Sequence, residues 1–123
     1  MGISLMRNYL TVLVSSTSLL ACASSSSSNS FSEWELFKSY SLSSCIATHY
    51  EESNIYQDAI DALNGYREFG SLPLEAYHEV SAVINSYSPE QYRSKAGNIS
   101  ELAMCVAIQN SKDIKDIYAK YAR

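Results

Sequence analysis

Between Phe31 and Arg123 the apolar residues recur at intervals of three and four, and no stretch alternates strictly between apolar and polar residues. The first spacing places side chains on one face of an α-helix, whereas strict alternation is the pattern of a half-buried strand. The 123-residue chain also has only four glycines and two prolines, too few for the many turns of a β-sandwich. The sequence therefore predicts an all-α fold, a small bundle of about five helices.

Local signals divide this part of the chain into helices. Ser32 and Glu35 form a capping-box pattern at the start of the first helix, and Ser71 and Ser111 are the expected caps of the third and the fifth. Gly70 is expected to end the second helix in the left-handed conformation. The expected helices are residues 31–50, residues 53–70, residues 71–87, a segment around 99–106, and residues 111–121.

The same spacing predicts which faces are buried. Gly65 lies inside the second helix, where glycine costs about 1 kcal/mol relative to alanine, and we expect the close approach of another helix to compensate. The fourth helix is expected to bury Ile99, Leu102, Ala103 and Val106. Serines between residues 39 and 44 lower the helix propensity of the first helix, so tertiary packing must stabilise it.

Residues 1–21 have the features of an export signal. Arg7 supplies a positive charge ahead of a mostly apolar stretch that is too short to span a bilayer as a helix. The segment Leu19-Leu20-Ala21-Cys22 resembles the bacterial lipobox, in which the cysteine is lipidated and the chain is cleaved just before it. The alternative is an ordinary cleavable signal in which Cys22 has no role.

A serine-rich segment follows Cys22 directly. Residues 24–28 and residue 30 are serines, and such a segment is a flexible tether that cannot bury a core. Residue 23 is alanine and not aspartate, so retention in the inner membrane is not signalled, and we expect an outer-membrane anchor facing the periplasm. The predicted organisation is a signal peptide (residues 1–21), an anchor cysteine and tether (residues 22–30) and a folded domain (residues 31–123).

Export also decides the roles of the three cysteines. With Cys22 assigned to the lipid, Cys45 and Cys105 remain in an oxidising compartment and are expected to form one intrachain disulfide. The chain-entropy model gives about 4 kcal/mol for a loop of this length. Two alternatives remain open: a nucleophilic dyad of Cys45 with His49 on one helix face, and a metal site of Cys45, His49 and Cys105.

The net charge of the chain and the positions of its acidic residues limit the functions that the sequence can support. Thirteen acidic against nine basic side chains give a net charge of −4, which argues against a nucleic-acid-binding protein. The acidic pairs Glu51-Glu52 and Asp58/Asp61 are expected to be solvated helix faces. We predict no catalytic residue, no metal and no cofactor.

The longest irregular stretch of the domain is residues 87–98. Ser88, Pro89, Gly97 and Asn98 are turn residues, and the stretch also carries two tyrosines, Tyr87 and Tyr92, and two basic side chains, Arg93 and Lys95. Tyrosine has an apolar body and a polar tip and is enriched at protein interfaces. This stretch is therefore predicted to be an interface.

Five short segments resemble, in order and spacing, the immunity proteins that neutralise the fourth family of type VI secretion amidase effectors. The resemblance covers about residues 35–123. The segments are Leu42-Ser43-Ser44-Cys45-Ile46-Ala47, Gly65-Tyr66-Arg67-Glu68-Phe69-Gly70, Pro73-Leu74-Glu75-Ala76-Tyr77, Tyr92-Arg93-Ser94-Lys95 and Met104-Cys105-Val106.

The resemblance implies a small periplasmic helical protein, commonly a homodimer, that protects the cell from a cysteine amidase that cleaves peptidoglycan peptide stems. It implies inhibition by occlusion: a protruding loop enters the amidase cleft, and the dimer mate assists. Here the matching loop is residues 87–98, and the implied effector-binding residues are Ser88, Glu90, Gln91, Tyr92, Arg93, Ser94 and Lys95. Two other functions remain as alternatives, a lipid-anchored envelope scaffold or regulator with no amidase partner, and a small hydrolase using Cys45 and His49.

Overall fold

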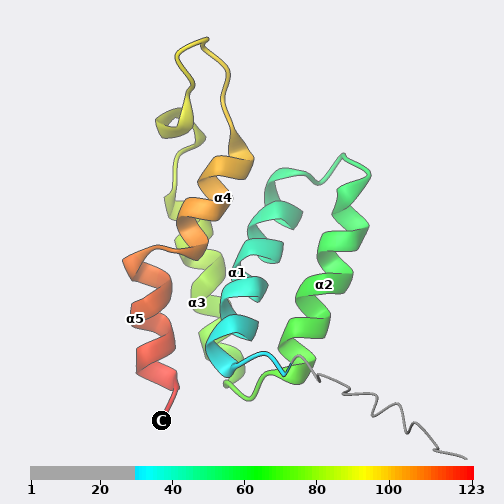
Figure 1. The fold of residues 1–123 in the computed structure, drawn as a ribbon, viewed down its shortest axis with the longest axis vertical. Helices are drawn as coiled ribbons and strands as arrows, with labels where there is room; N and C mark the ends of the chain where they lie inside the picture. The colour runs from blue at the N-terminus through cyan, green and yellow to red at the C-terminus, as the bar shows by residue number, and fades with distance from the viewer. Residues whose placement is uncertain (1–29) are drawn as a thin grey trace, which may run out of the picture.

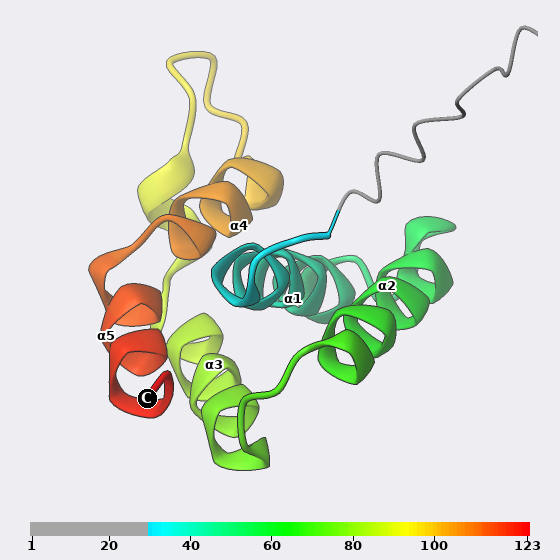
Figure 2. The same cartoon turned by 60° about the horizontal axis from the view of Figure 1, so that its bottom comes forward.

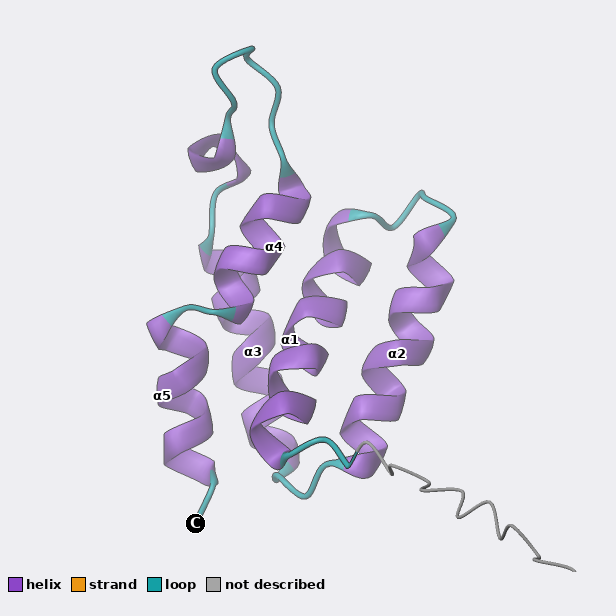
Figure 3. Ribbon diagram, viewed as in Figure 1, coloured by secondary structure: helices purple, strands orange, loops and turns teal. Residues whose placement is uncertain are grey.

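A computed structural model describes residues 30–123; the predicted signal peptide, Cys22 and most of the tether lie outside the described residues. Five α-helices and one short 3-10 helix follow one another in this part of the chain, which contains no strand (Figures 1 and 3). They are α1 (Glu33–His49), α2 (Ile55–Phe69), α3 (Leu74–Ser86), η1 (Pro89–Tyr92), α4 (Glu101–Gln109) and α5 (Lys112–Tyr121). The prediction of an all-α fold is confirmed.

Helix α1 is the central element of the domain. Helix α2 packs on one side of it, and α3, α4 and α5 pack on the other (Figure 2). Its middle turns bury Ser41, Ser43 and Ser44, and the Ser41 hydroxyl donates a hydrogen bond to the Phe37 carbonyl at 2.9 Å. Small side chains allow neighbours to approach on several sides, so packing compensates for the low helix propensity of these serines.

The hydrophobic core lies between α1 and helices α3 to α5. The tyrosine rings of α1 and α3, Tyr40 and Tyr77, meet edge to face with centroids 4.6 Å apart, and burial raises the pKa of both hydroxyls. The largest fully buried apolar side chains are Phe37, Val80, Ile84, Met104, Ile108 and Ile114. Among the described residues, those that form or flank this core lie between Trp34 and Tyr121.

A disulfide between Cys45 and Cys105 joins α1 to α4. Their Cα atoms are 5.4 Å apart, and both residues are fully buried. The predicted pairing is confirmed, and it links the central helix to the helix that follows the irregular stretch.

Two predicted helix ends are wrong. Helix α3 begins at Leu74, and Ser71 does not cap it; the Ser71 amide and hydroxyl instead donate hydrogen bonds to the Glu33 carboxylate at the start of α1. Gly70 is extended, with φ −82°, and not left-handed. A glycine fits this position because it has no side chain: a Cβ here would lie 2.5 Å from the Tyr77 hydroxyl oxygen.

The predicted packing partner of Gly65 is also absent from residues 30–123. Apart from its chain neighbours and the adjacent backbone of α2, no atom of the described residues lies within 4 Å of the position that a Cβ would occupy on Gly65. Among the described helices, α2 packs against α1 alone, so no second helix approaches this glycine.

The predicted buried face of α4 is wrong as well. Ile99, Leu102 and Val106 are 37%, 50% and 44% exposed, whereas Met104, Cys105 and Ile108 are buried. The sequence of α4 is apolar on nearly every side, so periodicity alone selects no face. The disulfide at Cys105 fixes which side turns inward.

Candidate partner-binding loop

Residues 87–100 connect α3 to α4 and project from one end of the helical bundle (Figure 1). The segment contains the short helix η1 and then a narrow hairpin, whose two arms meet in an isolated antiparallel bridge between Arg93 and Ile99. The predicted irregular stretch is therefore the most protruding part of the bundle's upper end in Figure 1.

Two tyrosines attach the loop to the domain. Tyr87 and Tyr92 are half-buried against the core, and the Tyr87 hydroxyl donates to the Asp113 carboxylate of α5 at 3.4 Å. The amide of Ser100 donates to the Tyr92 carbonyl at 3.1 Å, where the returning arm enters α4. These contacts fix both ends of the loop.

Arg93 braces the loop from within. Its guanidinium forms an ion pair with Glu90 of η1 and donates a hydrogen bond to the Gly97 carbonyl at the tip. One side chain therefore ties η1 to the turn, and a planar guanidinium can hold both partners at once.

The tip is a closed turn. The Ser94 amide donates to the Asn98 carbonyl at 2.7 Å, and the Ser94 hydroxyl accepts a bond from the Asn98 amide at 3.2 Å. Gly97 donates its amide to the Ser94 carbonyl at 2.9 Å and has φ +88°, a conformation that favours glycine. The turn is thus held in one shape by its own backbone.

The loop presents mostly polar side chains to solvent. Within residues 30–123 the Lys95 ammonium forms no ion pair, so the tip carries a positive charge available to a partner. Of the predicted effector-binding residues, Tyr92 attaches the loop to the domain, and Arg93 and Glu90 form the ion pair inside the loop. All of the others are exposed, just before η1, on η1 or at the tip: Ser88, Gln91, Ser94 and Lys95.

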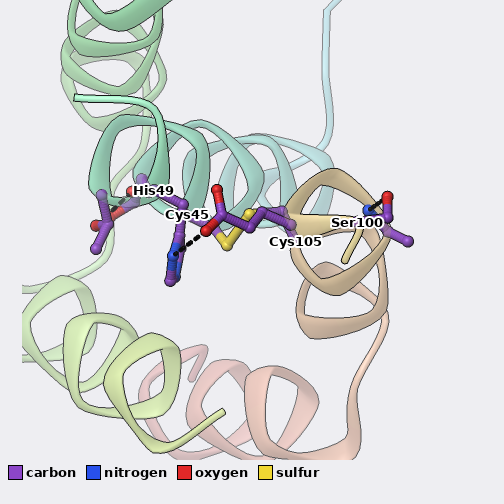
Figure 4. Close-up of a disulfide and its surroundings, with 8 residues drawn as sticks. Cys45, His49, Ser100 and Cys105 are labelled. Carbon is purple, nitrogen blue, oxygen red and sulfur yellow. Dashed lines mark hydrogen bonds and ion pairs between the residues drawn. A yellow bond between two sulfur atoms is a disulfide. The ribbon is translucent and has the colours of Figure 1, made fainter. Parts of the chain in front are cut away.

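The two cysteine-based alternatives do not form in this structure. Both sulfur atoms are bonded to each other, so neither Cys45 nor Cys105 supplies a thiolate to His49 or to a metal. His49 lies beside the disulfide at the end of α1, with Nδ1 4.0 Å from a carboxylate oxygen of Glu101 (Figure 4). Its Nε2 is buried without a hydrogen-bond partner among the described residues.

The predicted acidic clusters lie on the surface of α2 and of the turn that precedes it. Glu51, Glu52, Asp58 and Asp61 are all exposed, and Asp61 accepts a hydrogen bond from Gln57 at 2.9 Å. No helix in residues 30–123 has the length and apolar character needed to cross a membrane.

Sequence reasoning missed the bracing role of Arg93. The hydrogen bond from Arg93 to the Gly97 carbonyl depends on the turn that brings position 97 back beside position 93.

Comparison with known proteins gives one assignment, which comes from a family model. No curated protein matches the chain. A family model described as type VI secretion system (T6SS) amidase immunity protein, Tai4, matches residues 35–118, which is more than half of the chain and includes the whole protruding loop. The chain therefore belongs to the family of type VI secretion system amidase immunity proteins.

Proposed function

We propose that this protein binds a type VI secretion peptidoglycan amidase in the periplasm and inhibits it by occluding the active-site cleft with residues 87–98. The supporting observation is a self-braced loop that projects from the bundle of a chain in an amidase immunity family. An inhibitor of this kind needs no catalytic residue of its own, because it acts by denying the substrate access to the cleft.

The internal contacts of the loop favour tight binding. A flexible loop loses conformational freedom when it enters a cleft, and this loss reduces affinity. Here the Arg93 brace and the Ser94–Asn98 turn order the loop before binding. The exposed side chains of Gln91 and Lys95 are then free to contact the amidase.

The proposal includes the organisation of the exported protein. Residues 1–21 direct export, Cys22 carries a lipid in the outer membrane, and residues 23–30 are a tether for the domain. The domain acts as a homodimer, in which the second copy assists the inhibition. The whole assembly faces the periplasm, where a peptidoglycan amidase acts.

The decisive experiment measures binding and peptidoglycan hydrolysis in the same samples. Residues 23–123, which include all of the described helices, are mixed with the amidase encoded beside the gene. We expect tight binding with loss of hydrolysis. The double variant Gln91→Ala/Lys95→Ala removes two exposed loop side chains. It should weaken binding and restore hydrolysis without lowering the melting temperature.

A matched control removes two exposed side chains on other elements, Glu68→Ala near the end of α2 and Lys115→Ala on α5, and should inhibit like the native chain. Full inhibition by the loop variant would contradict the loop assignment. Binding without inhibition would exclude occlusion of the cleft. Absence of binding to this amidase and to a second candidate would favour the envelope-scaffold alternative.

A further inference from the structure

The three most exposed large apolar side chains in residues 30–123 lie at the end of the domain where the chain enters. Phe69 is 79% exposed, Phe31 55% and Leu74 53%. Helices α1 and α3 begin at this end and α2 ends there (Figure 1), and hydrogen bonds from Ser71, between α2 and α3, to Glu33 of α1 hold these ends together. The braced loop lies at the opposite end of the domain, so these side chains form a second surface, separate from the proposed amidase-binding one.

An apolar groove of about 590 Å³ is part of this surface. Apart from the chain neighbours of Gly65 and the adjacent backbone of α2, no described atom lies within 4 Å of a Cβ built on that glycine, so no side chain covers it. The residues that line the groove are Ser30, Phe31, Leu36, Ala62, Gly65, Tyr66 and Phe69. The groove therefore offers apolar walls to a partner that is itself apolar.

The position of the groove relative to Cys22 indicates which partner reaches it. Ser30, which lines the groove, follows Cys22 by eight positions, and eight residues span at most about 29 Å even when fully extended. A lipid on Cys22 therefore keeps this end of the domain close to the phospholipid surface. A short linker gives a tethered group an effective concentration in the millimolar range, so a contact that is weak in solution forms once the chain is anchored.

The charges beside the apolar side chains favour a lipid surface without net charge. Three exposed carboxylates, Glu35, Glu68 and Glu75, are close to them in sequence, against one exposed guanidinium, Arg67. Anionic lipids attract clusters of lysine and arginine, which this end of α1, α2 and α3 does not offer in residues 30–123. Apolar burial is therefore the driving force available to this surface.

We propose that this end of the domain is a membrane-contact surface. Phe31, Phe69 and Leu74 enter the interface of the phospholipid layer that holds the Cys22 lipid, and acyl chains occupy the groove. Exposed apolar patches of this kind mark sites of protein or membrane contact, and here the short tether selects the membrane. The contact orients the anchored domain, so that the loop at the opposite end is directed away from the lipid.

The inference rests on the lipid anchor in the proposed function and not on amidase inhibition. Its test replaces the natural anchor: residues 23–123 with an N-terminal hexahistidine tag are bound to phosphatidylcholine vesicles that contain a nickel-chelating lipid. This anchors the chain next to the position of Cys22, whether or not that cysteine carries a lipid in cells. Palmitate labelling of the native chain in cells measures the natural anchor separately.

Tryptophan fluorescence reports the contact. Trp34 is the single tryptophan of the chain and provides the baseline. Phe69→Trp adds an indole at the proposed surface, and Leu102→Trp, at an exposed apolar position on α4, is the matched control. Bromine atoms on the acyl chains quench an indole that enters the hydrocarbon. We expect brominated vesicles to remove the emission that Phe69→Trp adds and to leave the emission that Leu102→Trp adds.

A second variant tests the other two side chains of the surface. Phe31→Ser/Leu74→Ser in the Phe69→Trp chain removes most of the remaining apolar contact and should restore the quenched emission. Melting temperatures check that every chain is folded, which we expect because all three side chains are more than half exposed. Adding phosphatidylglycerol to the vesicles should not increase the quenching, since the contact gains nothing from anionic lipid.

Three outcomes would overturn the inference. Equal emission of the Phe69→Trp chain in plain and brominated vesicles, with quenching by acrylamide in the water, would show that this end of the domain stays in solvent. Protection of the same indole from both bromine and acrylamide would identify a protein as the occupant, such as a second copy of the chain. Quenching that appears only with phosphatidylglycerol would show a charge-driven contact in place of the apolar one.

Discussion

Gly65 and Gly97 have opposite conformational requirements, and substitution by alanine should separate them. Gly97 has φ +88°, so Gly97→Ala should lower the free energy of unfolding by about 1–2 kcal/mol. Gly65 is helical with free space at its Cβ, so Gly65→Ala should raise it by about 1 kcal/mol. Thermal unfolding at a concentration that keeps the chain monomeric measures both changes. Shifts of the same sign would contradict this account.

Single residues show where sequence reasoning succeeds and where it fails. The capping box of Ser32 and Glu35 is confirmed, because it involves atoms only three residues apart. The Ser71 cap is wrong because Glu33, 38 residues earlier in the chain, accepts the hydrogen bonds of Ser71. Local chemistry was therefore predictable, and a contact set by the tertiary fold was not.

At the scale of elements, the disulfide holds α4, and with it one arm of the loop, against α1. The double variant Cys45→Ala/Cys105→Ala should lower the free energy of unfolding by about 2–5 kcal/mol, since it opens a loop of 60 residues in sequence. Denaturant unfolding measures the loss. A reductant should reproduce it in the native chain and leave the double variant unchanged; a reductant effect on the variant would point to another cause.

An ion-pair cluster joins α3 to α5 and predicts a specific dependence on pH. Hydrogen bonds from the Lys120 ammonium and then the Tyr121 hydroxyl lower the pKa of the Glu79 carboxyl below its ordinary value of 4.5. A carboxyl with a depressed pKa stabilises the fold above its unfolded pKa, and this contribution is lost as the pH falls through the folded value.

Glu79→Gln should therefore lower the melting temperature near neutral pH and reduce the further loss of stability as the pH falls below 4.5. The control is Glu75→Gln, which changes an exposed carboxylate on the same helix and should retain the native pH profile. Melting temperatures across this range provide the measurement. Parallel curves for native and Glu79→Gln chains would show that the cluster does not contribute.

The spacing of apolar residues predicted some features of the helices and missed others. It located the helices, because α2 and α3 each have an apolar face, on which Ala59 and Val80 are buried. It failed for α4, whose apolar residues surround the helix, and it could not reveal that residues 87–98 fold into a braced hairpin. That shape depends on Arg93 and on the backbone of the turn.

At the scale of the whole molecule, the loop and the entry of the chain lie at opposite ends. The described chain begins beside the start of α1, and the loop projects beyond the far end of that helix (Figure 1). Seventeen helical residues at about 1.5 Å each separate these ends by roughly 25 Å. A lipid on Cys22 would therefore attach to the end of the domain opposite the loop and would leave the loop free to bind a partner.

This arrangement predicts that anchoring and amidase binding are independent. The native gene should give a protein that incorporates labelled palmitate and remains with the membrane fraction. A chain in which an ordinary secretory signal replaces residues 1–22 should incorporate no label and be released with the periplasmic fraction, yet bind the amidase with unchanged affinity. Equal release of both chains without label would exclude the lipid anchor. Weaker binding by the released chain would show instead that the anchor helps to form the inhibitory surface.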